Sequence, residues 1–597
     1  MSTVTSTEQS PRYLDLALSP EERAEDLLAR MTLEEKAGLL FQPATAMNDD
    51  GTPLDAPHPE YAVHTATEVV RDRHITHLHL LNGEDPYRIA QWHNHIQDMA
   101  ADTRLGIPVT VSTDPRHGTF SSPLTGETME HLSRWPEHTG FGALPEDEAE
   151  RRVEEYADVV RREYLAMGFR VALGPMADLF TEPRWSRGYG TFGEDPETVA
   201  RLTSAFLRGL RGGDALGPDG VAAVVKHFPG GGPQLKGDDA HDTRYPEQVY
   251  PGGRRDLHLK PFQAAIEAGA TQMMTYYGKP VGTDWPEVGF AFNKPVVEGI
   301  LRGELGFDGI VVSDWYVIDR TVFQGHTFGP NAYGLEDRTP IQRLAAALDA
   351  GLDQFGGDDC TEHIVELVRS GQVSEERIDV SARRLLREKF RLGLFENRHV
   401  DPDQAAQLCG SRPLRTAGRA AQSDSTVLVK NDNSLLPVAP GSKVYVEGVD
   451  AAAFTGHAEI VTDPAAADLA LLRLHAPYSQ DPDGLISYFH GGDLAFTAEQ
   501  NDHVRAIAAQ APTAVAVYLE RPAVMPEIAD AAHAILGDFG ADDSVLAHLV
   551  LGTHAPHGHL PFDLPSSMNA VESHPEDVPF STADPLYRYG HGLTYEG

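Results

Sequence analysis

A carboxylate at the end of an apolar run is the first feature of the sequence that points to chemistry. Residues 309–312 are apolar, as in a strand buried within a parallel sheet, and the run stops at Ser313, Asp314 and Trp315. In folds that alternate strands and helices, functional side chains gather where parallel strands end. A carboxylate in that place can attack the anomeric carbon of a sugar, and an indole beside it offers a flat apolar face to the ring. We therefore expect Asp314 to be the central functional residue.

Four further apolar runs end at polar residues in the same way. These runs, each with polar residues that follow it, are 107–111 with Asp114, 169–174 with Asp178, 221–225 with Lys226 and His227, and 271–274 with Tyr277. Helical patterns precede and separate them, at residues 14–40, at 146–167 and from Asp195 onward, where Asp suits an N-cap and the following Pro suits a first helical turn. The alternation predicts an α/β fold, a (β/α)8-like TIM barrel over residues 1–396, whose polar strand ends converge on one face.

The pattern changes after residue 396. Residues 397–418 are polar and contain Pro402 and Pro413, which is typical of a linker. A second alternating set follows, with apolar runs that begin at Thr426, Val444, Leu469, Ala514 and Ala534. Together with a helix-like segment at 499–510, this set predicts a smaller C-terminal α/β sandwich domain over residues 419–597, with helices on both faces of its sheet.

The composition narrows the classes of ligand and compartment. The 597 residues include 89 acidic and 49 basic ones, a net charge of −40, which argues against nucleic acid and anionic membranes as partners. No apolar run is long enough to span a membrane and residues 1–30 hold no apolar signal-peptide core, so we expect a cytoplasmic protein. Only Cys360 and Cys409 occur, and the 27 histidines show no metal-ligand spacing. We therefore expect no disulfide framework, no metal and no cofactor.

Eight short sequence motifs are spread along nearly the whole chain. They are MTLEEKAG at 31–38, TDPRHG at 113–118, EPRWSRGY at 182–189, FGEDP at 192–196, VKHFPG at 225–230, VSDW at 312–315, GHLPFDLP at 558–565 and YGHGLTY at 589–595. Taken together, these strings resemble glycoside hydrolase family 3, the β-glucosidase-like retaining exo-glycosidases. The resemblance implies hydrolysis by double displacement, with the active site in the cleft between the two domains. The fibronectin-like third domain of many relatives is not expected here.

The resemblance also assigns roles to individual residues. It places Asp314 at the nucleophile that forms a covalent glycosyl-enzyme intermediate, and Asp114 at the carboxylate that accepts hydrogen bonds from the far hydroxyls of the sugar. The other substrate-binding positions are Arg187, Lys226 and His227 in a cationic cluster around the sugar, Tyr277 as the hydrogen-bond partner of the nucleophile, and Trp315 packed on the aglycone side. Residues 317–339, rich in Gly and aromatic residues, are expected to wall the aglycone side as well.

The general acid is the position that the resemblance does not assign. A retaining mechanism needs a second acidic group, roughly 5–5.5 Å from the nucleophile when it is a carboxyl group, to protonate the leaving oxygen. In the family this group usually comes from a glutamate of the second domain, but residues 475–490 contain no glutamate. Asp483 is our first candidate there and Asp481 the second, with Asp493 and Glu499 further along.

A histidine offers a different solution. His241 follows the VKHFPG string and stands beside Asp238 and Asp239. This grouping resembles the branch of the family that uses a histidine with an aspartate as its acid/base, although the spacing differs. His241 is therefore an alternative acid/base residue, with either aspartate as its partner.

The most specific function that these observations support is removal of terminal β-D-glucosyl residues from oligosaccharides or aglycones. Asp114 favours a sugar with hydroxyls at both C4 and C6. Three alternatives stay open: a β-xylosidase or aglycone deglycosylase, a β-N-acetylglucosaminidase or phosphorylase that uses His241, and a sugar-binding protein with weak catalysis. The expected partner is a small-molecule or oligosaccharide β-glycoside, and the oligomeric state, including a homo-oligomer, stays open.

Overall fold

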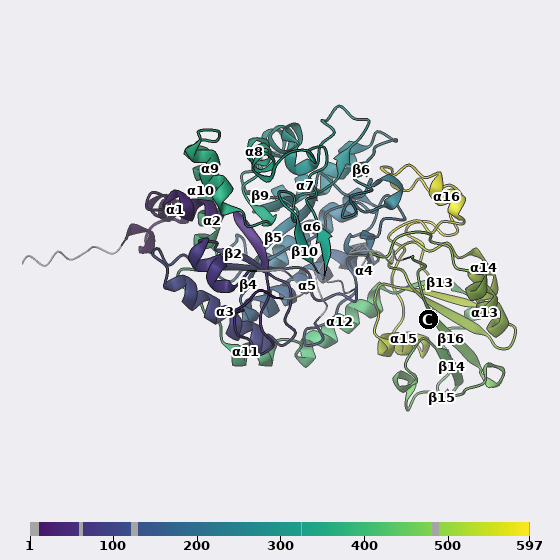
Figure 1. Cartoon of the computed structure of the whole chain (residues 1–597). Coiled ribbons are helices and arrows are strands. Elements are labelled where there is room, and N and C mark those ends of the chain that lie inside the picture. Colours follow the sequence, from purple (N-terminus) through teal and green to yellow (C-terminus); the bar gives the residue numbers. More distant parts are fainter. Residues whose placement is uncertain (1–10, 59–63, 121–128, 324, 480–488, 596–597) are drawn as a thin grey trace, which may run out of the picture.

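The chain folds into two domains that lie side by side, with the barrel domain first in sequence (Figure 1). The computed structural model describes residues 11–58, 64–120, 129–323, 325–479 and 489–595. Within those ranges, no helix combines the length and the apolar character needed to cross a membrane.

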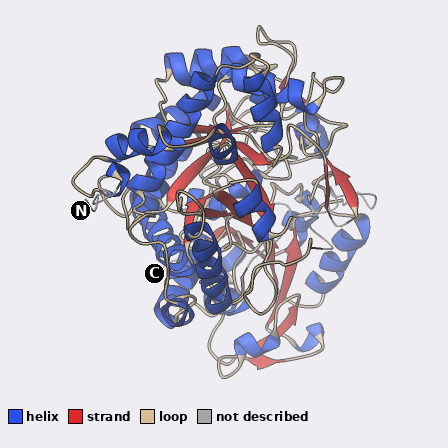
Figure 2. Ribbon diagram, turned by 60° about the vertical axis from the view of Figure 1, so that its left-hand side comes forward, coloured by secondary structure: helices blue, strands red, loops and turns tan. Residues whose placement is uncertain are grey.

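Eight parallel strands form the centre of the first domain. They are β1 (Phe41–Thr45), β2 (His77–Leu80), β3 (Thr110–Thr113), β4 (Phe169–Ala172), β5 (Ala222–Phe228), β7 (Gln272–Thr275), β9 (Ile310–Val312) and β12 (Phe355–Gly357). Their order in the sheet is β12-β1-β2-β3-β4-β5-β7-β9, and a parallel bridge between Val312 and Gln354 joins the two outer strands. Figure 2 shows the strands enclosed by helices. The predicted (β/α)8-like barrel is confirmed.

Helices surround the barrel strands of this domain (Figure 2). They are α1 (Pro20–Leu28), α2 (Leu33–Leu39), α3 (Pro86–Ala101), α4 (His138–Gly142), α5 (Glu146–Met167), α6 (Pro196–Arg211), α7 (Arg255–Glu267), η6 (Pro295–Glu304), α8 (Pro340–Ala350), α9 (Thr361–Arg369) and α10 (Glu375–Arg391). Ser19 and Thr32 form capping boxes at the first two helices. The Asp195 carboxylate caps α6 by accepting the N–H groups of Glu197 and Thr198. Each cap satisfies backbone donors that a helix start leaves unpaired.

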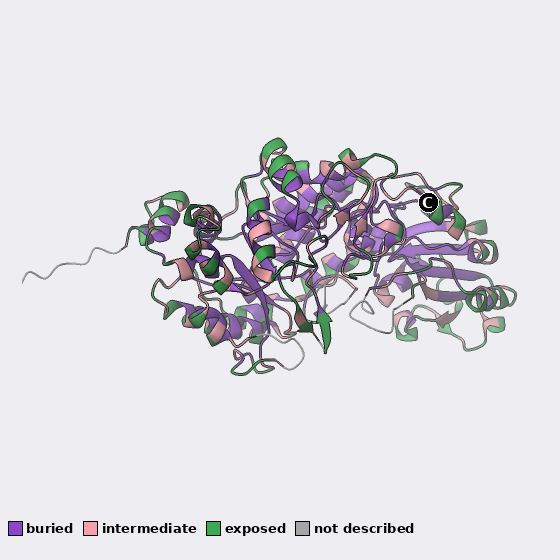
Figure 3. Cartoon of the chain, turned by 45° about the horizontal axis from the view of Figure 1, so that its top comes forward, coloured by how far each residue is buried: buried purple, intermediate pink, exposed green. Residues whose placement is uncertain are grey.

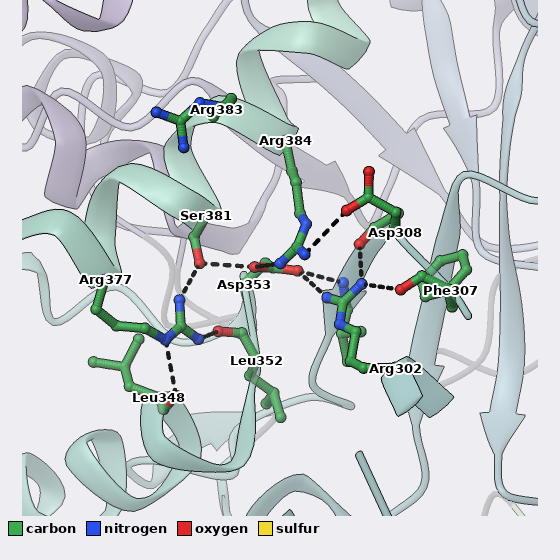
Figure 4. Close-up of polar contacts among 12 residues, drawn as sticks. Arg302, Phe307, Asp308, Leu348, Leu352, Asp353, Arg377, Ser381, Arg383 and Arg384 are labelled. Atoms are coloured by element: carbon green, nitrogen blue, oxygen red, sulfur yellow. Dashed lines mark hydrogen bonds and ion pairs between the residues drawn. The ribbon is translucent and has the colours of Figure 1, made fainter. Parts of the chain in front are cut away.

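A buried polar network holds the barrel closed beneath the strand that carries Asp314 (Figure 4). At its centre is the fully buried Asp353 carboxylate. It accepts hydrogen bonds from Arg302 (2.6 Å), Ser381 (2.8 Å), Arg384 (3.0 Å) and the backbone N–H of Val311 (3.0 Å). Because these donors come from η6, α10 and β9, one carboxylate joins two helices to the strand. The network therefore fixes the position of β9 and, with it, the position of Asp314, which lies two residues after the strand.

The second domain has a six-stranded sheet covered by helices. Its strands are β13 (Val427–Asn431), β14 (Lys443–Glu447), β15 (Glu459–Ile460), β16 (Leu469–His475), β17 (Thr513–Tyr518) and β18 (Ala534–Asp538), in the order β13-β18-β17-β16-β14-β15. Only β13 runs antiparallel to its neighbour among these described strands. The helices α13 (Ala498–Ala508) and α14 (Pro526–Ala531) pack on one face and α15 (Asp543–Val550) on the other. Figure 3 shows the buried strands between partly exposed helices, which confirms the predicted sandwich.

The segment predicted as a linker is largely helical. Residues 397–418 contain α11 (Pro402–Leu408) and the first part of α12 (Arg412–Ser425). Helix α11 packs against α3 and α5 of the barrel, so this part of the connection is attached to the first domain. The exact limits of the two domains stay a prediction.

Candidate active site

The carboxyl ends of the barrel strands surround a cavity of about 60 Å³. Seven of the residues predicted for the site line it, namely Asp114, Arg187, Lys226, His241, Tyr277, Asp314 and Trp315. The eighth, His227, lies next to the cavity, with its Nε2 3.9 Å from Oδ2 of Asp314. The two remaining candidates, Asp481 and Asp483, lie outside the described residues.

One of the two carboxylate oxygens of Asp314 is hydrogen-bonded, and the other has no partner among the described residues. The side chain is buried, and its Oδ1 accepts the backbone N–H of Trp315 at 2.8 Å. Its Oδ2 has no hydrogen-bond partner in the described part of the chain. Buried polar atoms are nearly always paired, so an unpaired carboxylate oxygen on a cavity wall marks a position for a ligand or a reacting atom.

His227 is held in one orientation behind this carboxylate. Its Nδ1 lies 3.0 Å from Oδ2 of the fully buried Asp178, which also accepts the backbone N–H groups of His227 and Gly231. A carboxylate can only accept, so Nδ1 carries the hydrogen. Burial, together with the nearby charge of Arg187, lowers the pKa of His227, and the ring is therefore neutral at pH 7. His227 thus belongs to the cationic cluster by position and not by charge.

Asp114 is an ionised carboxylate held by two nitrogen groups. Lys226 Nζ lies 3.2 Å from its Oδ1, and His79 Nε2 lies 3.2 Å from its Oδ2. Burial by itself raises the pKa of Asp114, but the Lys226 ammonium and His79 outweigh burial and hold the pKa well below its usual range. The charged form therefore persists at the bottom of the cavity, where it can accept hydrogen bonds from hydroxyl groups.

His241 forms a dyad with one of its two aspartate neighbours. Its Nδ1 lies 2.5 Å from Oδ1 of the buried Asp239, whose Oδ2 accepts the indole N–H of Trp185 at 3.0 Å. Burial favours the neutral acid, but His241 and Arg187 outweigh it and lower the pKa of Asp239. With Nδ1 engaged, Nε2 is the ring nitrogen that remains for the cavity. The structure thus selects Asp239 and not Asp238 as the partner of His241.

Tyr277 and Trp315 form a wall beside the nucleophile position. The Tyr277 hydroxyl donates to the backbone carbonyl of Trp315 at 2.8 Å. Burial, with the charge of Asp314, raises the pKa of Tyr277 well above its usual value, so the hydroxyl keeps its proton. The indole lies against β12, where a Cβ on Gly356 would come within 2.6 Å of the ring and one on Gly357 within 2.9 Å. Two glycines in β12 thus make room for the Trp315 indole.

Arg187 supplies two buried donor atoms that form no hydrogen bond within the described part of the chain. Its side chain is buried, and Nε and Nη1 have no hydrogen-bond partner among the residues that the structure describes. Burial opposes the charge, but Asp239 and Asp314 outweigh burial and raise the pKa of Arg187. A guanidinium that stays charged between two carboxylates can donate to sugar hydroxyls.

Residues of both domains contact the residues of the site. From the barrel, Phe328 of the hairpin formed by β10 (Thr321–Phe323) and β11 (His326–Phe328) lines the cavity. That the segment 317–339 walls the aglycone side stays a prediction. From the second domain, the Phe489 ring lies 4.9 Å from the His241 ring, measured between centroids. The predicted location between the domains is therefore consistent with the contacts of His241.

Comparison with family models covers most of the chain. The model described as "Glycosyl hydrolase family 3 N terminal domain" matches residues 32–388, and "Glycosyl hydrolase family 3 C-terminal domain" matches residues 454–595. The chain belongs to glycoside hydrolase family 3. As a member of this family, the protein is a glycoside hydrolase.

Individual family 3 proteins resemble the chain over almost its full length. It is 44% identical over 591 residues to "Beta-glucosidase C" of Emericella nidulans, with 98% of this chain and 94% of the relative covered. It is 36% identical over 608 residues to the "Periplasmic beta-glucosidase/beta-xylosidase" of Dickeya chrysanthemi, covering 98% and 91%. A solved β-glucosidase of Erythrobacter marinus has the same fold, with a TM-score of 0.79, 22% identity and coverage of 98% and 84%.

The site of this family 3 protein also contains residues that the sequence analysis missed. His79 pairs with Asp114, and Phe489 contacts His241 from the second domain. A signal for His79 exists, because β2 reads His-Leu-His-Leu and places a polar side chain at every second position of a buried strand. Phe489 has no such signal, because its partner comes from the other domain.

Proposed function

We propose that this family 3 protein is a retaining, exo-acting β-glucosidase that hydrolyses terminal β-D-glucosyl residues by double displacement. The observation that carries the proposal is the free Oδ2 of the buried Asp314, in the same cavity as the ionised Asp114 and the His241–Asp239 dyad. The name of the Emericella nidulans relative, a β-glucosidase, supports the choice of sugar, and the name of the Dickeya chrysanthemi relative includes both β-glucosidase and β-xylosidase.

In the first step, Asp314 acts as the nucleophile. Its Oδ2 forms a bond to the anomeric carbon while the glycosidic carbon–oxygen bond breaks. The leaving oxygen takes the proton from Nε2 of the His241 imidazolium, so the aglycone departs as a neutral alcohol and a glycosyl ester remains on Asp314.

In the second step, His241 acts in the reverse sense. Neutral Nε2 accepts a proton from a water molecule whose oxygen attacks the anomeric carbon, and the ester bond to Asp314 breaks. Two inversions at the same carbon give net retention. Asp239 accepts the Nδ1 hydrogen of His241 in both protonation states of the ring and keeps that hydrogen in place, as expected for a carboxylate paired with a catalytic histidine.

The other site residues hold the sugar. The two oxygens of Asp114 can accept from neighbouring hydroxyls of one glucosyl ring, while Lys226 and Arg187 donate to others. Trp315 and Phe328 provide apolar faces for the leaving group. A terminal sugar without the hydroxyl at C6 loses one of these contacts, so β-xylosides are expected to be poorer substrates than β-glucosides.

Azide rescue tests the nucleophile and the acid/base together. With a dinitrophenyl β-glucoside, Asp314→Ala should lose at least about 1000-fold in kcat, and azide should restore turnover by attacking the substrate directly, which gives an α-glucosyl azide. His241→Ala should still form the ester on Asp314, and azide should then give a β-glucosyl azide. The anomeric proton signal in NMR distinguishes the two products.

The opposite results would each refute part of the proposal. An α-azide from His241→Ala would remove Asp314 from the nucleophile role. A His241→Ala variant with normal kcat/KM on all substrates would return the acid role to Asp483 or Asp481, whose Asn variants serve as the comparison. The cytoplasmic location and the oligomeric state stay predictions.

A further inference from the structure

Three ligand-type side chains of the second domain converge at the carboxyl ends of two neighbouring strands. His475 is the last residue of β16, and Glu520 follows β17, which pairs with β16 in parallel. Glu520 Oε2 lies 3.1 Å from Nε2 of His475 and 2.7 Å from Nδ1 of His490. One ligand atom of each residue lies within 4.8 Å of the others. None of the three has a role in the proposed hydrolytic steps.

The hydrogen positions at His475 create an electrostatic conflict. Its Nδ1 lies 2.7 Å from the carbonyl oxygen of Ala476, which can only accept, so Nδ1 carries a hydrogen. In the neutral ring, Nε2 then has a lone pair, and this lone pair faces a carboxylate oxygen of Glu520. Two acceptors at 3.1 Å repel each other unless a positive charge lies between them. That charge is either a second proton on the ring or a metal ion.

Glu520 offers a spare oxygen as well. The side chain is 1% exposed, and Oε1 has no hydrogen-bond partner among the described residues. A buried carboxylate oxygen without a partner is costly in a structural ion pair, whereas a metal ion can use both oxygens. The bond from Nδ1 of His475 to a backbone carbonyl is also the arrangement that orients metal-ligating histidines.

The surroundings suit an ion with one open position. The His490 ring stacks on Tyr478 at 3.7 Å and the His475 ring meets the edge of Tyr518 at 4.8 Å, both between centroids, so neighbouring rings fix the two imidazoles. The side chain of His475 is 36% exposed, which leaves a path for a water molecule as the fourth ligand. Two imidazoles, one carboxylate and one water form a donor set that Zn²⁺ accepts in tetrahedral geometry.

We propose that His475, His490 and Glu520 form a binding site for a divalent transition-metal ion, with Zn²⁺ as the fitting member of the class. The bound ion connects His475 at the end of β16 and Glu520 after β17 to His490, the neighbour of Phe489 in the sequence. Because the Phe489 ring contacts His241, the ion fixes a side chain of the second domain against the barrel site. Its role is structural, and the site stands whether or not the protein is a β-glucosidase.

Calorimetric titration of the full chain, stripped with a chelator and then titrated with Zn²⁺, tests the site. The wild type should bind one equivalent, and His490→Ala should bind at least about 100-fold more weakly, because loss of one of three protein ligands removes a coordinate bond. His475→Ala, at the more exposed ligand, provides a second variant in case the first is poorly folded. At the same Zn²⁺ concentration, the Tm of the wild type should rise more than that of either variant.

A histidine of the same domain supplies the control. His503 also pairs with a carboxylate, Glu447, at 2.7 Å, but it lies outside the three-residue group. His503→Ala should therefore bind Zn²⁺ as the wild type does. If the wild type binds no ion, or if both ligand variants bind as tightly as the control, the proposal is wrong and a proton balances the charge of Glu520.

Discussion

Replacing Asp239 by Asn should weaken His241 as an acid while leaving the fold around it unchanged. Asn has nearly the same shape as Asp, but it has one acceptor oxygen instead of two. In the structure, Oδ1 of Asp239 lies 2.5 Å from Nδ1 of His241 and Oδ2 accepts from Trp185 at 3.0 Å. An Asn at this position must therefore direct its NH₂ group toward one of these two donors.

Both orientations weaken the acid. If the amide oxygen faces His241, the ring keeps its tautomer but loses a charge-assisted hydrogen bond, worth about 1.5–3 kcal/mol, or roughly 10- to 150-fold in rate. If the NH₂ group faces His241, Nδ1 must become the acceptor and the hydrogen moves to Nε2, the wrong tautomer for the second step. The loss should therefore lie between about 10- and 10,000-fold, depending on which orientation the Asn side chain adopts, for a substrate whose leaving group needs a proton.

The assay is kcat/KM across β-glucosides whose leaving groups differ in pKa, because kcat/KM reports the step that forms the glycosyl ester. Dinitrophenolate leaves without a proton, so Asp239→Asn should lose less than about tenfold with that substrate and the full amount with cellobiose. Asp238→Asn, at the neighbouring carboxylate that does not contact His241, is the matched control. An equal loss with every leaving group would refute the assignment of His241 and Asp239 to proton transfer.

Two further substitutions test the support of the sugar site. Lys226→Met should lower the free energy of unfolding by about 3–5 kcal/mol, because it removes the ammonium group that pairs with the buried carboxylate of Asp114 and leaves His79 as the remaining partner. The pKa of Asp114 is lower in the folded protein than its unfolded value of about 3.9, so its ionised form stabilises the native protein fully above that value. This contribution is lost as the pH falls from about 3.9 toward the folded pKa, so the Tm difference from wild type should be constant above about pH 5 and shrink below about pH 4. A Tm difference independent of pH would contradict this. Gly356→Ala places a Cβ 2.6 Å from the Trp315 ring and should raise KM several-fold. The control is Gly299→Ala, which has open space around the added Cβ and should leave KM unchanged. Equal KM values in both variants would show that the indole does not contact substrate.

The sequence was sufficient wherever the decisive interaction is local or periodic. A parallel strand buried on both faces must be apolar along its length, so the barrel strands are visible as apolar runs and their ends as the first polar residues. Asp314, Asp114 and Lys226 lie at or just beyond such ends, and barrel closure brings them to one cavity. Helix starts were equally predictable, since a capping side chain such as Asp195 acts on backbone groups two or three residues away.

Tertiary structure decided which polar groups became partners. Asp238 and Asp239 are equivalent in the sequence, and only the fold of their turn brings Asp239 to Nδ1 of His241. His475, His490 and Glu520 have no ligand spacing along the chain. They meet because the sheet places the end of β16 beside the end of β17 and because His490, which lies between these strands in the sequence, contacts Glu520. The physical reason is that burial, charge and hydrogen-bond satisfaction depend on all neighbours in space, whereas a sequence pattern reports only the neighbours along the chain.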